Sequence, residues 1–251
     1  MAHTYKYPKA DVTVDCVLFG FHPEGRIEVV LIRRGVEPFK GKWALPGGFI
    51  NLPDETAENA AERKLREETG ITVGFLEQLY TFDAPDRDPR GRVLSVAYYG
   101  LVRTQDHIAK CGTDATEALW MSVADAMALP PSDWAFDHHE ILQTAVTRLQ
   151  GKVMYAPIVG FNLLPRRFTL AQLQRLYEAV LFRPLDRGNF RKRIRILNQA
   201  TGILVKAGER RNSKRPGPPA TLYRFNKKAY EKAVRDGFNF EMQTTNKRKE
   251  Q

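Results

Sequence analysis

The sequence predicts an α/β fold, with a mixed sheet between helices, followed by a smaller C-terminal helix-turn-helix domain. Strand-like runs alternate with amphipathic helical segments over residues 1–150, and two short helical segments follow one another after residue 165. The net charge also changes sign. Residues 1–150 carry 16 Lys+Arg against 22 Asp+Glu, or −6, whereas residues 151–251 carry 23 against 7, or +16. This asymmetry indicates an anionic polymer or surface as partner of the C-terminal part.

The composition favours a cytoplasmic protein with a hydrophobic core. The 251 residues are 43% hydrophobic and 27% charged, with no apolar run of membrane-spanning length and nothing near the N-terminus that resembles a signal peptide. Cys16 and Cys111 lack both metal-ligand spacing and a disulfide framework, and the pair His138-His139 is interpreted as structural. We therefore expect neither a membrane partner nor a metal site.

Strand-like runs define the sheet of the first part. Two apolar, β-branched runs at residues 12–19 and 27–32 flank a Pro-Glu-Gly turn and predict a hairpin. The segment 43–45 leads into a glycine pair. Further strand-like runs lie at residues 74–82, 93–102 and 118–121.

Helical segments alternate with these strands. Apolar residues recur at three- and four-residue steps from Ala57 to Leu65, so one face of this helix should pack against the sheet. Thr56 is the expected N-cap, and Gly70 follows the last turn as a stop signal. Two more helices are expected, at residues 123–127 after Ser122 and at residues 136–149.

The first of these helices carries a charged motif. Residues 47–70, GGFINLPDETAENAAERKLREETG, resemble a Nudix box: Glu55, Arg63, Leu65, Glu67, Glu68 and Gly70 hold its spacing. Gly48 lies one residue too far upstream, as if the loop had one insertion, which leaves Asp54 or Glu55 as its acidic member. So many fixed residue types make this a strong motif rather than an ordinary charged helix. It predicts the Nudix α/β/α sandwich.

Lys64 stands where the Nudix box carries a glutamate that binds metal. A glutamate there would bring three carboxylates together with Glu67 and Glu68, a suitable cage for a divalent cation that bridges substrate phosphates. Lys64 removes one ligand and can instead pair with Glu67 or Glu68. We therefore expect no metal and no catalytic residue in this degenerate box, made up of Glu55, Arg63, Lys64, Glu67 and Glu68.

The segment 82–92, FDAPDRDPRGR, is a candidate ligand-binding loop. Its arginines can bind a diphosphate, and Phe82 offers a ring for stacking. The same composition fits a solvated charged turn, which spacing alone favours. The predicted effector site consists of Phe82, Arg87, Asp88, Arg90 and Arg92 together with Gly48, Glu67 and Glu68.

The second part begins after an expected linker at residues 151–165. Thr169 followed by Gln172 has the form of a capping box, and apolar residues between 170 and 181 mark the buried face of a helix. A break at residues 182–185 turns the chain. A tight turn between two short helices is typical of a helix-turn-helix.

The second helix of this pair is rich in arginine. Asp186 can cap it, and Phe190, Ile194 and Leu197 face inward. The outward residues are the predicted DNA-binding set: Arg187, Asn189, Arg191, Lys192 and Arg195, of which Arg187, Asn189 and Arg191 are candidates for base edges.

A basic hairpin follows, with strands expected at residues 203–206 and 221–225 around the tip GERRNSKRPGPPA. Arg210, Arg211, Lys214 and Arg215 are candidate wing contacts to phosphate or the minor groove. A charged hairpin alone is usually only solvated, but the arginine-rich helix and the +16 half-chain favour DNA binding. We expect a winged-helix DNA-binding domain at residues 166–240 and a basic tail at residues 241–251.

These segments together resemble the Nudix-related transcriptional regulators of NAD metabolism, the NrtR family. The resemblance rests on the degraded box, TFDAPDRDPRGRVLSVAY, and LLPRRFTLAQLQRLYEAVL followed by DRGNFRKRIR, and it covers nearly the whole chain. It implies a homodimeric repressor of NAD biosynthesis or salvage genes. Residues 1–150 would form a Nudix domain that binds ADP-ribose as effector, requires no cofactor, and releases double-stranded operator DNA carrying an inverted repeat.

Three functions compete on these residues: an ADP-ribose-responsive repressor, an active ADP-ribose pyrophosphatase with a DNA-binding appendage, and an RNA-handling Nudix protein. Lys64 argues against the pyrophosphatase, although some relatives keep a complete box. RNA handling favours exposed aromatic residues among the basic ones, whereas Tyr177 and Phe190 fall at helix-core positions. We therefore expect the repressor.

Overall fold

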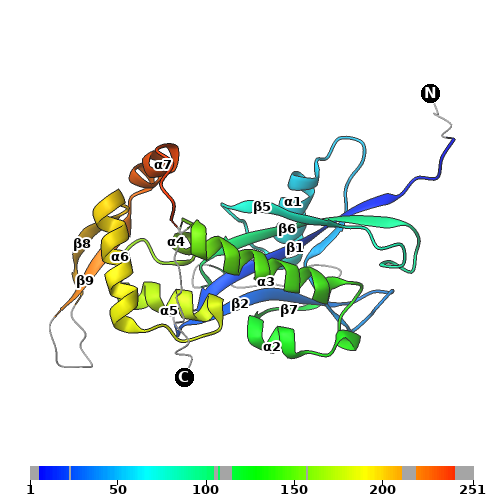
Figure 1. The fold of residues 1–251 in the computed structure, drawn as a ribbon. Helices are drawn as coiled ribbons and strands as arrows, with labels where there is room; N and C mark the ends of the chain where they lie inside the picture. Colours follow the sequence, from blue (N-terminus) through cyan, green and yellow to red (C-terminus); the bar gives the residue numbers. More distant parts are fainter. Residues whose placement is uncertain are drawn as a thin grey trace, which may run out of the picture. The chain divides into compact units, whose positions relative to one another are not determined.

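The computed structural model describes residues 6–22, 24–104, 107, 115–156, 158–210 and 219–240. The chain divides into two compact units (Figure 1): residues 1–22 with 27–147, and residues 23–26 with 148–251. Over the described residues, no helix has both the length and the apolar character that a membrane span requires.

The first unit is built on a seven-stranded mixed sheet with strand order β3-β2-β1-β6-β5, in which β4 pairs with β1 and β7 pairs with β2. Its strands are β1 Asp11–His22, β2 Arg26–Arg34, β3 Trp43–Ala44, β4 Gly47–Phe49, β5 Leu76–Phe82, β6 Val93–Val102 and β7 Ala115–Ser122. β1 runs parallel to β6, whereas β5 is antiparallel to β6. The predicted strands are confirmed, and β1 lies in the buried centre of the sheet.

Helices cover the sheet on both faces, as predicted (Figure 1): α1 Ala57–Thr69, α2 Val123–Ala128 and α3 His138–Tyr155. Thr56 caps α1 by accepting a hydrogen bond from the amide of Asn59, and Gly70 ends it in the left-handed conformation. Ala60, Ala61 and Leu65 of α1 are fully buried in one cluster with Cys16 of β1. Because successive strand residues point to opposite faces, Asp15 points away from α1 and meets the start of α3. The unit is therefore an α/β/α sandwich.

The sequence predicts a linker at residues 151–165, and the described residues of this segment are largely helical. Helix α3 continues to Tyr155, and a further helix, α4, covers Ile158–Leu163. The physical reason is burial: Val153, Leu163 and Leu164 are almost completely buried, and burying apolar side chains favours an ordered helix over a solvated connection. The division between the two units falls inside α3, after residue 147.

The second unit contains the predicted helix-turn-helix. Its remaining elements are α5 Leu170–Leu181, α6 Arg187–Thr201, β8 Leu204–Arg210, β9 Ala220–Phe225 and α7 Lys227–Arg235. The capping box of Thr169 and Gln172 and the Asp186 cap are both present. Tyr177 of α5 packs edge-on against Phe190 of α6, with ring centroids 5.5 Å apart. Helix α7 was not expected from the sequence.

The turn between α5 and α6 is fixed by side chains of α5. Gln174 donates a hydrogen bond from Nε2 to the carbonyl of Leu185, and Glu178 accepts one at Oε1 from the amide of Leu185, each at 3.0 Å. Phe182 ends α5 in the left-handed conformation. β8 and β9 then pair antiparallel as the wing, and residues 211–218 between them lie outside the described residues.

Candidate functional site

A cavity of about 260 Å³ lies beside the glycine-containing strand β4 of the first unit. Its wall draws on β1, β2, β4, α1, the loop between β5 and β6, and the start of α3. The cationic residues in the wall are Arg34, Lys64, Arg87 and Arg90, and the acidic ones are Asp15, Glu37, Glu68 and Asp88. Such a lining is chemically suited to a ligand that carries both anionic groups and hydroxyl groups.

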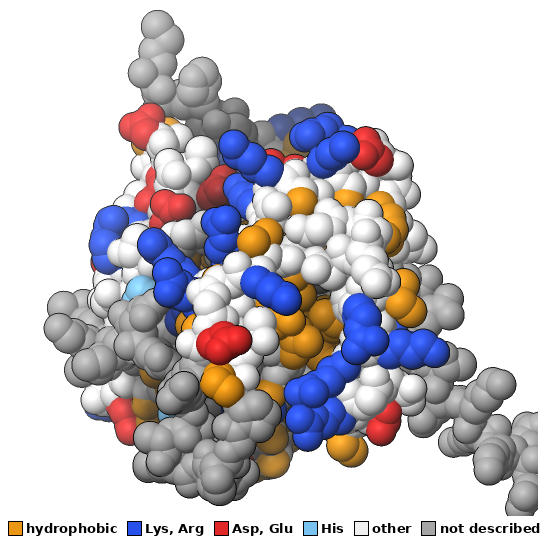
Figure 2. All heavy atoms as spheres, turned by 90° about the vertical axis from the view of Figure 1, so that its left-hand side faces the viewer, with side chains coloured by type: hydrophobic (Ala, Val, Ile, Leu, Met, Phe, Trp, Pro, Cys, Tyr) orange, Lys and Arg blue, Asp and Glu red, His pale blue; other side chains and the backbone are white. Residues whose placement is uncertain are grey.

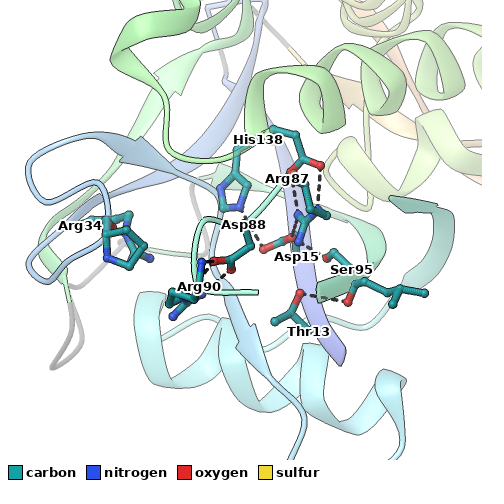
Figure 3. A network of polar contacts seen from close by, with 11 residues as sticks. Thr13, Asp15, Arg34, Arg87, Asp88, Arg90, Ser95 and His138 are labelled. Atoms are coloured by element: carbon teal, nitrogen blue, oxygen red, sulfur yellow. Dashed lines mark hydrogen bonds and ion pairs between the residues drawn. The ribbon is translucent and has the colours of Figure 1, made fainter. Parts of the chain in front are cut away.

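A buried ion-pair network forms the inner wall of the cavity. Figure 3 shows Arg87, Ser95 and His138 converging on Asp15. The guanidinium of Arg87 binds Asp137 through Nε at 2.8 Å and NH2 at 2.7 Å, and NH2 also reaches Asp15 Oδ2 at 3.2 Å. Arg87 is therefore committed to the protein and anchors its loop to β1 and to the start of α3.

His138 of this network is held as one tautomer. Its Nδ1 accepts a hydrogen bond from the amide of Leu45 at 2.9 Å, and its Nε2 lies 3.3 Å from Asp15 Oδ1. An amide N–H can donate only to an unprotonated ring nitrogen, so the hydrogen on Nε2 is the one that points to Asp15. The structural role expected for His138 agrees with this geometry.

Asp15 is ionised despite complete burial. Burial alone would raise the pKa of its carboxyl, but the contacts from His138, Arg87 and Ser95 outweigh burial and lower the pKa to about 2. Asp15 therefore stays a carboxylate throughout the physiological range.

The outer wall of the cavity combines guanidinium groups with aromatic rings. Arg90 forms a two-point ion pair with Asp88, through Nε at 2.9 Å and NH2 at 2.7 Å. Its guanidinium carbon lies 5.0 Å from the ring centroid of Phe49 and 5.5 Å from that of Phe136. Arg34 approaches the Phe136 ring to 5.0 Å. Stacked guanidiniums and an exposed ring can together bind a phosphate and a planar group.

The degenerate box adds an ammonium to the cavity. Lys64 lines it and lies 3.5 Å from Glu67 Oε2 and 4.0 Å from Glu68 Oε1. Glu55 is engaged elsewhere: hydrogen bonds from Arg63 and from the amide of Asn51 lower its pKa to about 2. Within the described residues, no three His, Cys, Asp or Glu side chains are grouped as a metal site requires. These residues do not fit the divalent cation expected of a complete box.

The structure brings five of the eight predicted effector residues to the cavity: Gly48, Glu68, Arg87, Asp88 and Arg90. The other three do not line it. Phe82 is buried beside Tyr80 and is not among the residues that line the cavity. Arg92 pairs with Asp83, and Glu67 pairs with Arg63 and Lys64.

The lining residues that were not predicted as ligand contacts include Arg34, Phe49, Phe136 and Asp15. Asp15 could have been identified from the sequence, because a carboxylate inside the buried run 12–19 must have charged or hydrogen-bonding partners. Arg34 ends β2 at the cavity, and only the pairing of β2 and β1 in the sheet places it there. Phe49 and Phe136 come from separate segments, which only the tertiary fold brings to one cavity.

The second unit presents a basic surface on α6. Arg187, Asn189, Lys192 and Arg195 are exposed and Arg191 is half-buried, while Phe190 and Ile194 face the core. Figure 2 shows Lys and Arg side chains spread over the side of the molecule that carries these elements. Of the predicted wing residues, the side chain of Arg210 and the whole of Arg211, Lys214 and Arg215 lie outside what the structure describes.

Comparisons with known proteins match both units. The family model for the NUDIX domain matches residues 9–145, and that for the NrtR DNA-binding winged helix domain matches residues 160–225. The chain is 36% identical, over 93% of its length and 87% of the relative, to the ADPR responsive transcriptional repressor NtrR of Acinetobacter baylyi.

Two solved structures from Shewanella oneidensis are also similar. NrtR complexed with a 27mer DNA has a TM-score of 0.71 and 33% identity, over 88% of this chain and 95% of that chain. The NUDIX domain of NrtR complexed with ADP ribose has a TM-score of 0.51 and 35% identity, over 57% of this chain and 90% of that chain.

The first prediction concerns Arg87. Arg87→Ala removes the guanidinium that pairs with Asp15 and Asp137 in a buried network and should lower the free energy of unfolding by about 3–5 kcal/mol. Arg92→Ala, in the same loop but exposed, is the matched control and should cost less than about 1 kcal/mol. Chemical denaturation of both variants measures the difference, and equal costs would contradict the anchoring role of Arg87.

The second prediction concerns pH. The folded-state pKa of Asp15, about 2, lies below its ordinary value of 3.8. Ionised Asp15 therefore stabilises the fold above about pH 4, and this stabilisation is lost as the pH falls toward 2. Its contribution, about 2 kcal/mol at neutral pH, should fall by about 1 kcal/mol between pH 6 and pH 3. The difference in unfolding free energy between wild type and Asp15→Asn should decrease by the same amount over this pH range. A difference that stays constant from pH 6 to pH 3 would contradict the low pKa.

Proposed function

The chain belongs to the NrtR family, and we propose that it is a transcriptional repressor of NAD biosynthesis or salvage genes. In this proposal the winged helix binds operator DNA and the Nudix domain binds ADP-ribose, which releases the DNA. That the target genes serve NAD biosynthesis or salvage is inferred from the resemblance to this family. A repressor acts where its operator is, so a cytoplasmic location follows.

The observation that carries this proposal is that one chain contains both a cation-lined cavity and an exposed, basic recognition helix. Arg34, Lys64 and Arg90 give the cavity cationic groups for a diphosphate, and Phe49 and Phe136 give it rings for a planar base. The exposed side chains of α6 match the second helix of a helix-turn-helix, which lies in the major groove. An enzyme alone would need no such helix.

Helix α3 offers a route from effector to DNA. It begins at His138 in the wall of the cavity and continues to Tyr155, past the division between the units. Within the second unit, Gln150 of α3 donates a hydrogen bond to the carbonyl of Val180 in α5 at 3.1 Å. We propose that an effector touching His138 alters DNA affinity through this continuous helix, by binding one state of the chain more tightly than the other.

We further propose that the protein senses ADP-ribose without turning it over, and that it works as a homodimer. Lys64 argues against an active pyrophosphatase, the alternative function, because its ammonium stands among the carboxylates that would hold the metal. Two winged helices in a dimer would bind an inverted repeat with half-sites separated by whole helical turns.

The third prediction tests the repressor by gel shift. ADP-ribose should release wild-type protein from a promoter fragment that contains an inverted repeat. Arg90→Ala should still bind DNA but respond to ADP-ribose only at more than tenfold higher concentration, since a hydrogen bond to a charged group contributes about 1.5–3 kcal/mol. Arg92→Ala, outside the cavity, is the control. Failure of wild type to respond to ADP-ribose would refute the proposed function.

The fourth prediction concerns DNA reading by α6. Alanine at Arg187, Asn189 or Arg191 should relax specificity at one base pair by about 1–3 kcal/mol, whereas loss of a phosphate contact should weaken all sequences alike and reduce the salt dependence. Lys40→Ala, exposed in the first unit, is the control. Footprinting on operator and scrambled duplex at two salt concentrations separates these classes. If Arg191→Ala binds both duplexes as wild type does, α6 is not the reading helix.

The fifth prediction concerns turnover. Purified protein with Mg²⁺ or Mn²⁺ should release AMP from ADP-ribose negligibly, because the carboxylate cage is incomplete. Release at about 1 s⁻¹ or faster, an ordinary enzyme rate, would instead establish the pyrophosphatase.

A further inference from the structure

The end of the Lys64 side chain lies at the centre of the degenerate box. Its ammonium is 3.5 Å from Glu67 and 4.0 Å from Glu68. A Cβ atom placed on Gly48 would lie 2.8 Å from Cε and 3.2 Å from Nζ of Lys64, so the glycine turn of β4 passes directly over this ammonium. Lys64 is thus confined between α1 and β4 while it lines the cavity.

The carboxylates that could have bound a metal already have protein partners. Both oxygens of Glu55 accept hydrogen bonds from Arg63, at 2.6 and 2.7 Å. Glu67 accepts from Arg63 at 3.1 Å, and Glu68 accepts from the amide of Gly47 at 3.1 Å. A divalent cation would have to displace these donors and the ammonium together.

Charge leads to the same conclusion. Glu55, Glu67 and Glu68 carry three negative charges, and Arg63 and Lys64 carry two positive ones, so these five side chains sum to −1. A glutamate at position 64 would bring the sum to −3, which a divalent cation would nearly balance. Replacing that glutamate by Lys64 thus changes the sum by +2, which equals the charge that a divalent cation would bring.

The ammonium also keeps donor capacity for a ligand. Its contacts with Glu67 and Glu68 exceed the usual N–H···O range of about 2.7–3.2 Å, so they hold it electrostatically without short hydrogen bonds. A lysine has three donors and binds phosphate as a point charge. Arg34 and Arg90 line the same cavity and can bind the remaining phosphate oxygens.

We propose that the ammonium of Lys64 replaces the divalent cation of this site and binds the diphosphate of the effector directly, so that effector binding requires no metal. This inference rests on the proposed function, because it takes ADP-ribose as the ligand. It also separates binding from cleavage: Lys64 attracts the diphosphate as a metal would but activates no water for attack.

The test is calorimetric titration of the full chain with ADP-ribose, in EDTA and in Mn²⁺. Wild type should bind with the same affinity in both conditions. Lys64→Met keeps the length of the side chain without its charge and should lose more than tenfold in both. Lys64→Glu should bind more weakly still in EDTA and recover at least tenfold in Mn²⁺. Lys40→Met, exposed and not among the residues that line the cavity, should match wild type, and thermal unfolding checks that each variant is folded.

Each outcome decides between supporting and rejecting the inference. A wild type whose affinity rises more than tenfold with Mn²⁺, a folded Lys64→Met that binds as wild type does, or a Lys64→Glu that gains nothing from Mn²⁺ would overturn it while leaving the repressor intact. If wild type binds no ADP-ribose in either condition, the proposed function fails and this inference fails with it.

Discussion

The cavity depends above all on one buried guanidinium, that of Arg87. It joins three segments that the sequence keeps far apart: β1 through Asp15, the loop before β6, and the start of α3 through Asp137. Forming a buried ion pair gains little net stability, because desolvation offsets the attraction, but losing one partner is costly. The contribution of Arg87 is therefore geometric. It holds in place an irregular loop that also carries Arg90 into the cavity wall.

A second constraint maintains the geometry of the box, the contact between β4 and α1, although its metal site is degenerate. A Cβ on Gly47 would lie 2.3 Å from the carbonyl oxygen of Val14, so only glycine lets β4 run this close to β1. The amide of Gly47 then donates to Glu68 of α1. A glutamate of the motif thus pins the helix to the turn, and this structural role explains how the motif can persist beside Lys64.

Local signals made much of the fold predictable, and tertiary contacts decided the rest. Thr56, Gly70, Thr169 and Asp186 act at helix ends as their side chains and spacing predict, because capping depends on neighbouring residues only. The sequence predicts a linker at residues 151–165, but Val153, Leu163 and Leu164 are buried and most of the described residues of this segment are helical. Of the predicted site, Arg87 was identified as a cation of the loop, yet its partners Asp15 and Asp137 are far away in sequence, so its structural role was not visible.

A sensor differs from an enzyme in what it does with binding energy. Catalysis requires contacts that are stronger in the transition state than in the ground state, whereas a sensor requires contacts that favour one conformation of the protein over another. In the proposed role, a lysine at position 64 suits the second requirement, because its ammonium would stabilise the bound diphosphate itself. If the effector is not hydrolysed, the fraction of occupied sites is set by the effector concentration at equilibrium. The occupancy of the operator can then report that concentration, which a competing hydrolysis at the same site would distort.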